Sequence, residues 1–469
     1  MSGRLPTVFL VDDEPEVLKA VARLLRAAGV PVSAFSSPRG FLDQVDPEAP
    51  GCLVLDMSMP GVSGLEVQRA LETRGCHLPV VFLTGRADVP DTVRAMKGGA
   101  SDFLTKPVED EELLGAVRRA IEKDAVLRRE RAEEALVRAR NGLYGSGMLP
   151  RRRLPGPVIS VGNITVGGTG KTPCVIMMAQ MLQRHGYLPA VISRGYGGKN
   201  PKPVNIVSDG KDILLNAEDS GDEPLLIARS LPNVPVITGA RRRLTGRAAI
   251  DQFGATVLIC DDAFQHRQIF RDIDIVLLDA EKPFSNGHLL PRGELREPVN
   301  SLHRAGCIIL TRADKKESLN SEVNLIVGRS HITIYRATHR FKEIISPAEN
   351  IRLPQSGLRG KKVCAFCGIA RPESFKKLLV EAEAQLLSFI PFPDHYAYDH
   401  YELEKLKKQF QALGADCWVT TEKDAVRLTA NPEFLKMLWV LRMEMEIEPS
   451  RQSFENFIVE GLAAVAYHG

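Results

Sequence analysis

The sequence predicts an α/β protein with an N-terminal doubly wound (βα)5 unit, a larger α/β/α domain and a smaller second α/β lobe. Short apolar runs of strand length alternate with amphipathic helical patterns, which is typical of parallel sheets covered by helices. A glycine-rich stretch at residues 158–173 lies between one such strand and one such helix. The length of 469 residues predicts about three domains at roughly 150 residues each. The expected boundaries are 1–125 for the first unit, 126–157 for a helical linker and basic segment, 158–340 for the larger domain and 341–469 for the C-terminal lobe.

Composition limits the class of protein. Hydrophobic residues make up 44% of the chain and charged residues 25%, which indicates a folded rather than a disordered protein. The net charge of +3 is too small to indicate a nucleic-acid partner. No apolar run has the length of about 18 residues that a membrane span needs, and the N-terminus lacks a signal-peptide pattern. A cytoplasmic location is therefore expected.

The cysteines indicate a reducing compartment. All eight lie scattered in the chain, several of them inside apolar segments, as expected of buried thiols. Cys364 and Cys367 form the one close pair in the sequence. With no second pair and no histidines at ligand spacing, packing within a strand is preferred over a zinc site.

Polar residues follow the apolar strands of the first unit. Carboxyl ends of parallel strands meet in one crevice, so these residues are expected to lie together. Three carboxylates, a hydroxyl and a lysine there would suit Mg²⁺, with one aspartate able to attack a phosphoryl group. The residues are Asp12 and Asp13 after the first strand, Asp56 after the third, Thr84 after the fourth and Lys106 after the fifth.

Residues 7 to about 122 carry this pattern in full and resemble a response-regulator receiver domain. The resemblance implies that Asp56 is the phosphoacceptor, with a sensor histidine kinase as the partner that phosphorylates it. It implies roles for Asp12 and Asp13 as metal carboxylates beside Asp56, for Thr84 and Lys106 as the phosphoryl-binding pair, for Phe103 as the switch aromatic and for Lys106-Pro107 as a cis peptide bond. No DNA-binding helix-turn-helix is visible after the domain.

The connecting segment is predicted to be one long helix from Asp110 to Arg140, because it is rich in Ala, Glu, Arg and Leu. The run Asn141-Gly-Leu-Tyr-Gly-Ser-Gly147 is expected to break this helix. Three consecutive arginines, Arg151 to Arg153, come before the next strand. They could face an anionic membrane surface or form a solvated run, and the sequence favours neither.

The stretch from Val158 to Pro173 has the pattern of a phosphate-binding loop. An apolar strand leads into glycines whose backbone N–H groups can surround an anion, and a helix starts directly afterwards. Thr165 stands where the general G-x-x-x-x-G-K-[ST] pattern has its first glycine. The expected ATP-binding residues are Thr165, Val166, Gly167, Gly168, Thr169, Gly170, Lys171 and Thr172, with the Thr172 hydroxyl on Mg²⁺.

Further motifs follow this loop in order. The strand Ala255 to Cys260 ends in Asp261-Asp262, which is the position of a metal carboxylate beside a phosphate-binding loop. These features predict a P-loop NTPase-like α/β/α domain, and Lys362 to Ile369 begins the second α/β lobe. The remaining motifs are Ser193-Arg-Gly-Tyr-Gly-Gly198, Gly221-Asp-Glu-Pro224, Leu295-Arg-Glu-Pro298, Asp394-His-Tyr396 and Thr420-Thr-Glu-Lys-Asp-Ala-Val426.

Together these motifs closely resemble the tetraacyldisaccharide 4'-kinase family from about residue 141 to the end. The resemblance implies transfer of phosphate from ATP to the 4'-hydroxyl of an acylated glucosamine disaccharide 1-phosphate, giving lipid IVA. It also implies work at the inner face of the bacterial inner membrane, although the family's hydrophobic N-terminal helix is replaced here by a charged helix, so only peripheral attachment is expected. The implied site consists of Asp222 and His395 as the proton-accepting pair, Lys171 on the phosphates, Thr172, Asp261, Asp262 and Glu297 around Mg²⁺, and Arg194, Tyr196 and Arg243 on the substrate.

Two other functions remain open at this stage. In the first, the chain is a two-component signalling protein whose receiver is the working part and whose lipid kinase part is impaired. In the second, it is a GTPase-like switch, because Thr311-Arg-Ala-Asp314 partly matches the guanine-reading N/T-K-x-D, with arginine in place of lysine. Lipid phosphorylation and nucleotide competition distinguish these hypotheses.

Overall fold

The structure, a computed structural model, describes residues 4–85, 89–313, 323, 332–349, 351–428, 432–448 and 450–467. It divides the chain into two compact units, Met1–Leu136 and Val137–Gly469. Asp314, part of the guanine-type motif, lies outside the described residues.

The first unit is a five-stranded parallel sheet with the strand order β2-β1-β3-β4-β5. All six residues of β3 are buried, which explains its continuous apolar run, whereas β2 is only partly buried and has a weaker pattern. Its strands are β1 (Thr7–Val11), β2 (Val32–Phe35), β3 (Gly51–Asp56), β4 (Val80–Thr84) and β5 (Asp102–Thr105), and its helices are α1 (Pro15–Ala27), α2 (Pro38–Gln44), α3 (Gly64–Thr73), α4 (Val89–Lys97) and α5 (Asp110–Gly145).

Two apolar cores cover the two faces of this sheet. One packs α1 and the first turns of α5 against Val8, Leu10 and Val54. The other packs α2 and α3 against Phe9 and Leu55. Because helices cover both faces, the unit has the doubly wound architecture that the sequence predicts.

Helix α5 is longer than predicted. It continues beyond Arg140 and ends at Gly145, inside the run from Asn141 to Gly147 that was predicted to break it. The last turns are held by contacts that a sequence pattern does not reveal: Val137 packs against an apolar core of the second unit, and the Asn141 carbonyl accepts a hydrogen bond of 2.8 Å from Arg267.

The second unit is built on one large sheet, with the strand order β16-β15-β17-β18-β13-β12-β11-β6-β10-β7-β9-β8 in the described part of the chain and β14 paired to β13. Around β6 the strands are parallel, with Val161 of β6 opposite Asp261 of β10. This register places the carboxyl ends of both strands at the same edge. The strands are β6 (Val158–Asn163), β7 (Pro189–Ser193), β8 (Asn205–Ser208), β9 (Val236–Thr238), β10 (Val257–Asp261), β11 (Ile273–Asp279), β12 (Cys307–Thr311), β13 (Thr333–Ser346), β14 (Ile351–Leu353), β15 (Lys362–Cys367), β16 (Gln385–Pro391), β17 (Cys417–Thr421) and β18 (Leu438–Glu448).

Helices pack on both faces of this sheet. One core joins α6, α8 and α15, and a second core packs α9 against the other face. The helices are α6 (Lys171–Arg184), α7 (Ala217–Ser220), α8 (Asp222–Ser230), α9 (Arg242–Phe253), α11 (Pro372–Glu381), α12 (His400–Ala412), α13 (Glu422–Arg427), α14 (Pro432–Leu435) and α15 (Arg451–Tyr467), with 3₁₀ turns η1 (Val299–Arg304) and η2 (Gln355–Leu358).

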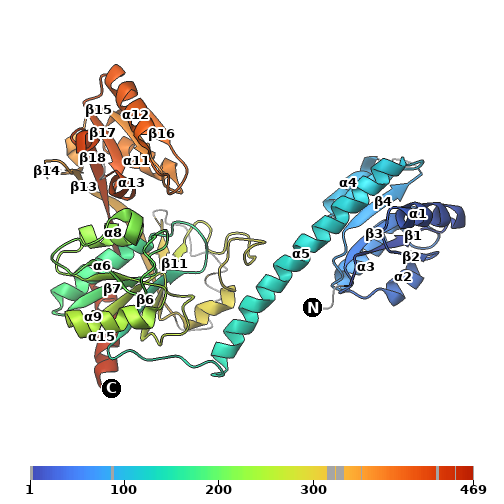
Figure 1. Cartoon of the computed structure of the whole chain (residues 1–469), viewed down its shortest axis with the longest axis horizontal. Coiled ribbons are helices and arrows are strands. Elements are labelled where there is room, and N and C mark those ends of the chain that lie inside the picture. Colours follow the sequence, from blue (N-terminus) through green and yellow to red (C-terminus); the bar gives the residue numbers. More distant parts are fainter. Residues whose placement is uncertain are drawn as a thin grey trace. The chain divides into compact units, whose positions relative to one another are not determined.

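The C-terminal lobe shares the sheet of the larger domain. Figure 1 shows β13 and β18 running from the larger domain into the lobe that holds β15, β16 and β17. These two long strands pair in antiparallel register from Arg336↔Glu448 to Ile345↔Val440. Helix α15 then returns to the larger domain, where Phe454 and Ile458 are buried. The two parts are thus connected by paired strands rather than by a flexible linker.

In the described residues, no helix is both long enough and apolar enough to span a bilayer. The eight cysteines are all buried and free, as predicted for reduced thiols. Cys364 and Cys367 lie on β15 inside the lobe core, as expected for packing residues.

Candidate active site

The phosphate-binding loop connects β6 to α6. β6 is fully buried, and Gly170 has the positive φ of 87° just before Lys171 begins the helix. A Cβ atom on Gly170 would lie 2.7 Å from the His339 ring, so only glycine fits this position without displacement. The side chain of Asn163 donates a 3.0 Å hydrogen bond to Oγ1 of Thr169 and holds the loop from inside.

Thr165, the position that departs from the general pattern, is buried and bridges to Leu295. The next residue, Val166, donates its backbone N–H to the Glu294 carbonyl at 2.8 Å. A second segment of the chain therefore fixes the start of this loop. Thr165 has the role of a structural anchor, and the phosphate-facing part of the loop begins at Gly167, which lines the cavity together with Gly168 to Thr172.

The acidic pair lies beside the loop, as its position after β10 predicts. The Nζ atom of Lys171 is 3.5 Å from Asp262, and Arg296 donates to the same carboxylate at 2.8 Å. Burial acts to raise the pKa of Asp262, but the charges of Lys171 and Arg296 outweigh it and hold that pKa below its ordinary value. Asp262 is thus an ionised carboxylate at the phosphate site.

Asp261 differs from its neighbour. It is buried and accepts a 3.1 Å hydrogen bond from Oγ of Ser193. Burial, together with the negative charges of Glu223 and Asp262, raises the pKa of Asp261 to about 7. A carboxylate kept out of water with so little compensating charge is well suited to a divalent cation.

Glu297, which the resemblance implies to lie near Mg²⁺, is held by other side chains in the structure. Its carboxylate is fully buried, forms an ion pair with Arg304 and accepts a 3.3 Å hydrogen bond from Asn141 of α5. Glu297 does not line the cavity, whereas its neighbour Arg296 does. In the structure the carboxylate of Glu297 is thus paired with Arg304, and its role at the metal stays a prediction.

Asp222 and His395 come together although 173 residues separate them. Asp222 is the first residue of α8, and His395 lies after β16 with the positive φ of 58°. Nδ1 of His395 is 3.3 Å from Oδ2 of Asp222. Both residues line the cavity that holds the phosphate-binding loop.

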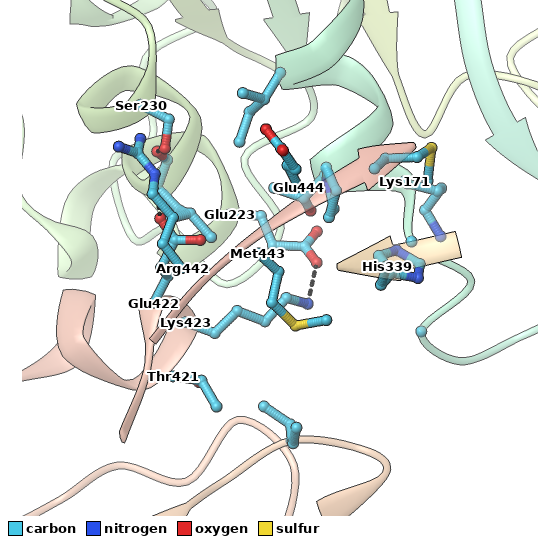
Figure 2. Close-up of a pocket in the computed structure, with 18 of the residues that line it drawn as sticks. Lys171, Glu223, Ser230, His339, Thr421, Glu422, Lys423, Arg442, Met443 and Glu444 are labelled. Atoms are coloured by element: carbon cyan, nitrogen blue, oxygen red, sulfur yellow. Dashed lines mark hydrogen bonds and ion pairs between the residues drawn. The ribbon is translucent and has the colours of Figure 1, made fainter. Parts of the chain in front are cut away.

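This cavity, of about 2140 Å³, lies between the larger domain and the lobe. Figure 2 shows its residues coming from three sides, with Lys171 near the loop, Glu223 from α8, and Lys423, Arg442 and Glu444 from the lobe. A dashed line in Figure 2 marks the ion pair of 3.0 Å between Lys423 and Glu223. A nucleotide and a second substrate can therefore meet in one space.

The three predicted substrate residues do not form one site. Tyr196 is 87% exposed and lines the large cavity. Arg243 lines a second cavity of about 420 Å³ together with Arg241, Arg242 and Arg152. Arg194 lines neither cavity, although its charge acts on Arg242 and on His266 of the second one.

Sequence reasoning missed several residues of the site. Ser193, Arg296, Lys423 and Glu223 lie within motifs recognised in the sequence, but without a role. Arg427, which follows Thr420 to Val426 directly, donates from Nε to Oδ2 of Asp222 at 2.6 Å. Their place in these motifs is the sequence signal that could have identified them. Their contacts with one another join distant parts of the chain and are known only from the structure.

In the first unit, Lys106 contacts two of the three aspartates that the sequence analysis named. Its Nζ atom lies 2.7 Å from Asp12 and 2.7 Å from Asp56. Burial raises the pKa of Asp12, and the hydrogen bond from Lys106 offsets only part of this effect. Burial acts to lower the pKa of Lys106, but the hydrogen bonds to Asp12 and Asp56 outweigh it and raise that pKa.

The other predicted residues surround this cluster. Asp13 is half-buried next to Asp12, and Thr84 is buried at the end of β4. The ring of Phe103 packs against Phe82 with a centroid separation of 6.4 Å. The Lys106-Pro107 peptide bond is cis, which confirms that prediction.

Comparison with known proteins decides the family. The family described as Tetraacyldisaccharide-1-P 4'-kinase matches residues 132–463, which is more than half of the chain. The chain belongs to the tetraacyldisaccharide 4'-kinase family. The family described as Response regulator receiver domain matches residues 8–118, so this member of the kinase family carries a receiver domain.

Similar proteins cover most of the kinase part. The tetraacyldisaccharide 4'-kinase of Syntrophus aciditrophicus is 45% identical over 332 residues, which cover 68% of this chain and 88% of that protein. The enzyme of Anaeromyxobacter sp. Fw109-5 is 41% identical over 314 residues, 66% of this chain and 83% of that protein. A crystal structure of LpxK from Aquifex aeolicus in complex with ATP has a TM-score of 0.60 and 30% identity, and covers 72% of this chain and 98% of that one. These similarities confirm the predicted fold class and the family.

Proposed function

We propose that this chain transfers the γ-phosphoryl group of ATP to the 4'-hydroxyl of a tetraacyldisaccharide 1-phosphate. The observation that carries the proposal is that the phosphate-binding loop, Asp262 and the Asp222–His395 pair surround one cavity. Phosphoryl transfer needs charge stabilisation, alignment and a proton acceptor, and these residues supply all three. The names of the relatives agree with this activity.

The phosphates of ATP would lie on Gly167 to Thr172. The backbone N–H groups of this loop and the N-terminus of α6 favour negative charge. Lys171 pairs with Asp262 in the structure, so its ammonium group is positioned at the site but shared with a carboxylate. In the complex it would also contact the transferred phosphoryl group and stabilise the charge there.

The residues present fit a magnesium ion. Thr172 and Asp262 line the same cavity, and the buried carboxylate of Asp261 adjoins Asp262. Mg²⁺ suits such a site, since it keeps several waters and binds substrate phosphates. Thr172, Asp261 and Asp262 would hold it, and bound there it would neutralise charge on the phosphate oxygens.

Asp222 and His395 are the proposed acceptors of the hydroxyl proton. Proton removal in the transition state needs a group within hydrogen-bonding reach of the hydroxyl, and this pair lines the cavity. His395 is half-exposed, so a substrate can approach it from solvent. The 4'-hydroxyl would lie between this pair and the γ-phosphate.

The second cavity would bind the 1-phosphate of the substrate. Its charged lining residues are Arg152, Arg241, Arg242 and Arg243, and Nε of the buried Arg242 has no hydrogen-bond partner in the described part of the chain. Burial and the charges of Arg242, Arg271 and Arg194 lower the pKa of His266 to about 4, which reports how positive this region is. Guanidinium groups bind phosphate well.

Peripheral contact with the inner face of the bacterial inner membrane is part of this proposal, because the substrate is a membrane lipid. The three arginines before β6 are exposed, so their charges can meet lipid headgroups. The backbone of Arg152 forms a β-bridge with Ile269, and the Arg153 guanidinium stacks on Phe270 at 3.7 Å. The exposed side chains of Leu143 and Met148 lie near them in the sequence and would add apolar contact.

The direct test is transfer of radiolabel from [γ-³²P]ATP to the acylated disaccharide in detergent micelles. We expect a labelled lipid with the wild-type chain and none with Asp222→Asn. Addition of unlabelled ATP should compete with the label, and GTP should not. If the chain binds GTP in preference to ATP or labels no lipid, the proposed function is wrong.

We further propose that Asp56 accepts a phosphoryl group from a sensor histidine kinase and that this modification changes the kinase rate. The support is the Asp12–Lys106–Asp56 cluster and the single helix α5, whose first turns pack in the receiver core and whose last turn contacts Glu297. Kinase rates should therefore differ between the untreated chain and a chain phosphorylated by a small-molecule phosphodonor. Asp56→Ala should remove the difference, and equal rates would exclude this regulation.

A signalling protein with an impaired kinase part is the alternative. It predicts normal phosphorylation of Asp56 and no labelled lipid. The same labelling assay, carried out with and without the phosphodonor, therefore distinguishes the two functions.

A further inference from the structure

The Asp222–His395 pair has a third partner, Arg427 of α13. Its Nε atom is 2.6 Å from Oδ2 of Asp222, and its Nη2 atom is 3.1 Å from Nδ1 of His395. The direct contact between Nδ1 and Oδ2 is longer, at 3.3 Å. One guanidinium group therefore contacts both members of the pair with two neighbouring N–H groups.

Nδ1 of His395 cannot accept a hydrogen bond from Arg427 and donate one to Asp222 at the same time. A guanidinium is always a donor, so Nδ1 of His395 must accept in its contact with Arg427. Nδ1 would have to carry a hydrogen in order to donate to Asp222. The contact with Arg427 is the shorter of the two, and arginine can only donate. Both facts favour a ring in which Nδ1 accepts from Arg427. The neutral ring then carries its hydrogen on Nε2, and its one acceptor lone pair, on Nδ1, is occupied by the hydrogen bond from Arg427. The carboxylate of Asp222 is therefore the group that can take a proton.

A buried network fixes the guanidinium in this place. The Arg427 side chain is only 7% exposed, and its Nη1 atom lies 3.4 Å from the buried carboxylate of Asp424. Asp424 in turn accepts hydrogen bonds of 2.6 Å from Thr421 and 2.9 Å from Tyr398. Nη1 also approaches the Gly368 carbonyl, which accepts from the His395 backbone N–H at 3.2 Å. The position of Arg427 is thus set independently of the nucleotide.

Other charged groups face the pair from several elements. Glu223 of α8 and Lys423 of α13 form their own ion pair one helical turn from Arg427 (Figure 2). Lys171 of the phosphate-binding loop and His395 both act electrostatically on Glu223, and Asp394 adjoins His395 in the loop. Arg427 is the cation that contacts Asp222 directly, so its removal should change the proton affinity of the pair most strongly.

We propose that Arg427 is a positioning residue of the phosphoryl transfer: it holds Asp222 and His395 together through Oδ2 and Nδ1 and keeps a positive charge beside the carboxylate that takes the proton. The inference rests on the proposed function. It assigns to the Thr420 to Arg427 segment a role in catalysis, although Arg427 itself does not accept the proton.

The test is the pH–rate profile of three variants. Arg427→Gln removes the cation, so the acid limb of kcat/KM should move to higher pH by about one unit or more, and the rate near neutral pH should fall. Arg427→Lys keeps the charge but cannot contact both partners at once, so kcat should fall while the acid limb stays in place. Lys407→Gln removes a cation of α12 that lines neither cavity and pairs with Glu404, so it serves as the control, with an unmoved acid limb.

An unmoved acid limb in Arg427→Gln, or the same shift in Lys407→Gln, would overturn the proposal. An inactive wild-type chain would instead refute the proposed function. If Arg427→Gln does not fold, the wild-type chain still gives an answer through ¹⁵N NMR of its histidines, with His395 assigned by comparison with His395→Gln. Above the acid limb the ring should carry its hydrogen on Nε2. A hydrogen on Nδ1 would contradict the inferred contact with Arg427.

Discussion

The ammonium group of Lys171 lies 3.5 Å from the carboxylate of Asp262, so the lysine of the phosphate-binding loop is already paired inside the protein. Arg296 pairs with the same carboxylate. Asp262 would therefore retain one cation if Lys171 moved toward a phosphate. This arrangement separates the effect of the lysine on catalysis from its effect on folding.

We expect Lys171→Ala to lower lipid phosphorylation by roughly 100-fold or more, because a charge aimed at the transferred group is lost. The midpoint of thermal unfolding should change little, since Arg296 still compensates Asp262. Label transfer and a thermal melt of the same sample measure both quantities. Undiminished transfer would mean that the nucleotide binds elsewhere.

Gly170→Ala should damage the nucleotide site through a steric clash. The added Cβ would meet the His339 ring at 2.7 Å, and the residue has a φ of 87°. Gly186 has a similar φ of 81°, but nothing lies within 4 Å of its Cβ position. Gly186→Ala is therefore the matched control for backbone strain, which costs about 1–2 kcal/mol in each variant. ATP affinity, measured by calorimetry, should fall at least about tenfold in Gly170→Ala alone.

Much of this fold could be predicted from the sequence because its parallel strands are buried on both faces. Segments such as Cys52 to Leu55 and Val257 to Cys260 are continuous apolar runs with polar residues directly after them, and that pattern is local. β2 was difficult to recognise because it is only partly buried. The continuation of the sheet into the lobe could not be predicted either, since it depends on the pairing of β13 with β18 over about a hundred residues of sequence.

The residues of the candidate site could likewise be predicted only in part from the sequence. The loop residues and the pair Asp261-Asp262 follow from strand ends, and the structure places them together. Asp222 and His395 were paired only by resemblance to a family, because nothing local connects residues so far apart. The metal role of Glu297 stays a prediction: its neighbour Arg296 lines the cavity, whereas the Glu297 carboxylate pairs with Arg304.

His266 predicts a dependence of stability on pH. Burial and nearby arginines lower its pKa to about 4 in the folded state, compared with about 6.5 in an unfolded chain. The folded state therefore binds the proton less tightly, and stability that is present above pH 6.5 is lost as the pH falls toward 4. His266→Gln removes this contribution, so its melting temperature should fall less than that of the wild type between pH 7 and pH 5. Equal decreases would show that His266 is not buried among these positive charges.

Glu297 can be assigned to one of two roles by a single substitution. In the structure it is the buried ion-pair partner of Arg304 and an acceptor for Asn141. Glu297→Gln should therefore destabilise the protein by about 3–5 kcal/mol in chemical unfolding, because Arg304 loses its buried counter-charge. The Mg²⁺ concentration that gives half-maximal activity should stay the same in the protein that remains folded.

Arg304→Met provides the comparison, since it breaks the same ion pair from the other side and leaves the Glu297 carboxylate in place. A metal ligand at position 297 would give a different result: Glu297→Gln would require more Mg²⁺, whereas Arg304→Met would not. Equal loss of stability in both variants, with an unchanged Mg²⁺ requirement, would assign Glu297 to the support of the loop. The metal would then depend on Asp261, Asp262 and Thr172, which is the arrangement that the burial of Asp261 already favours.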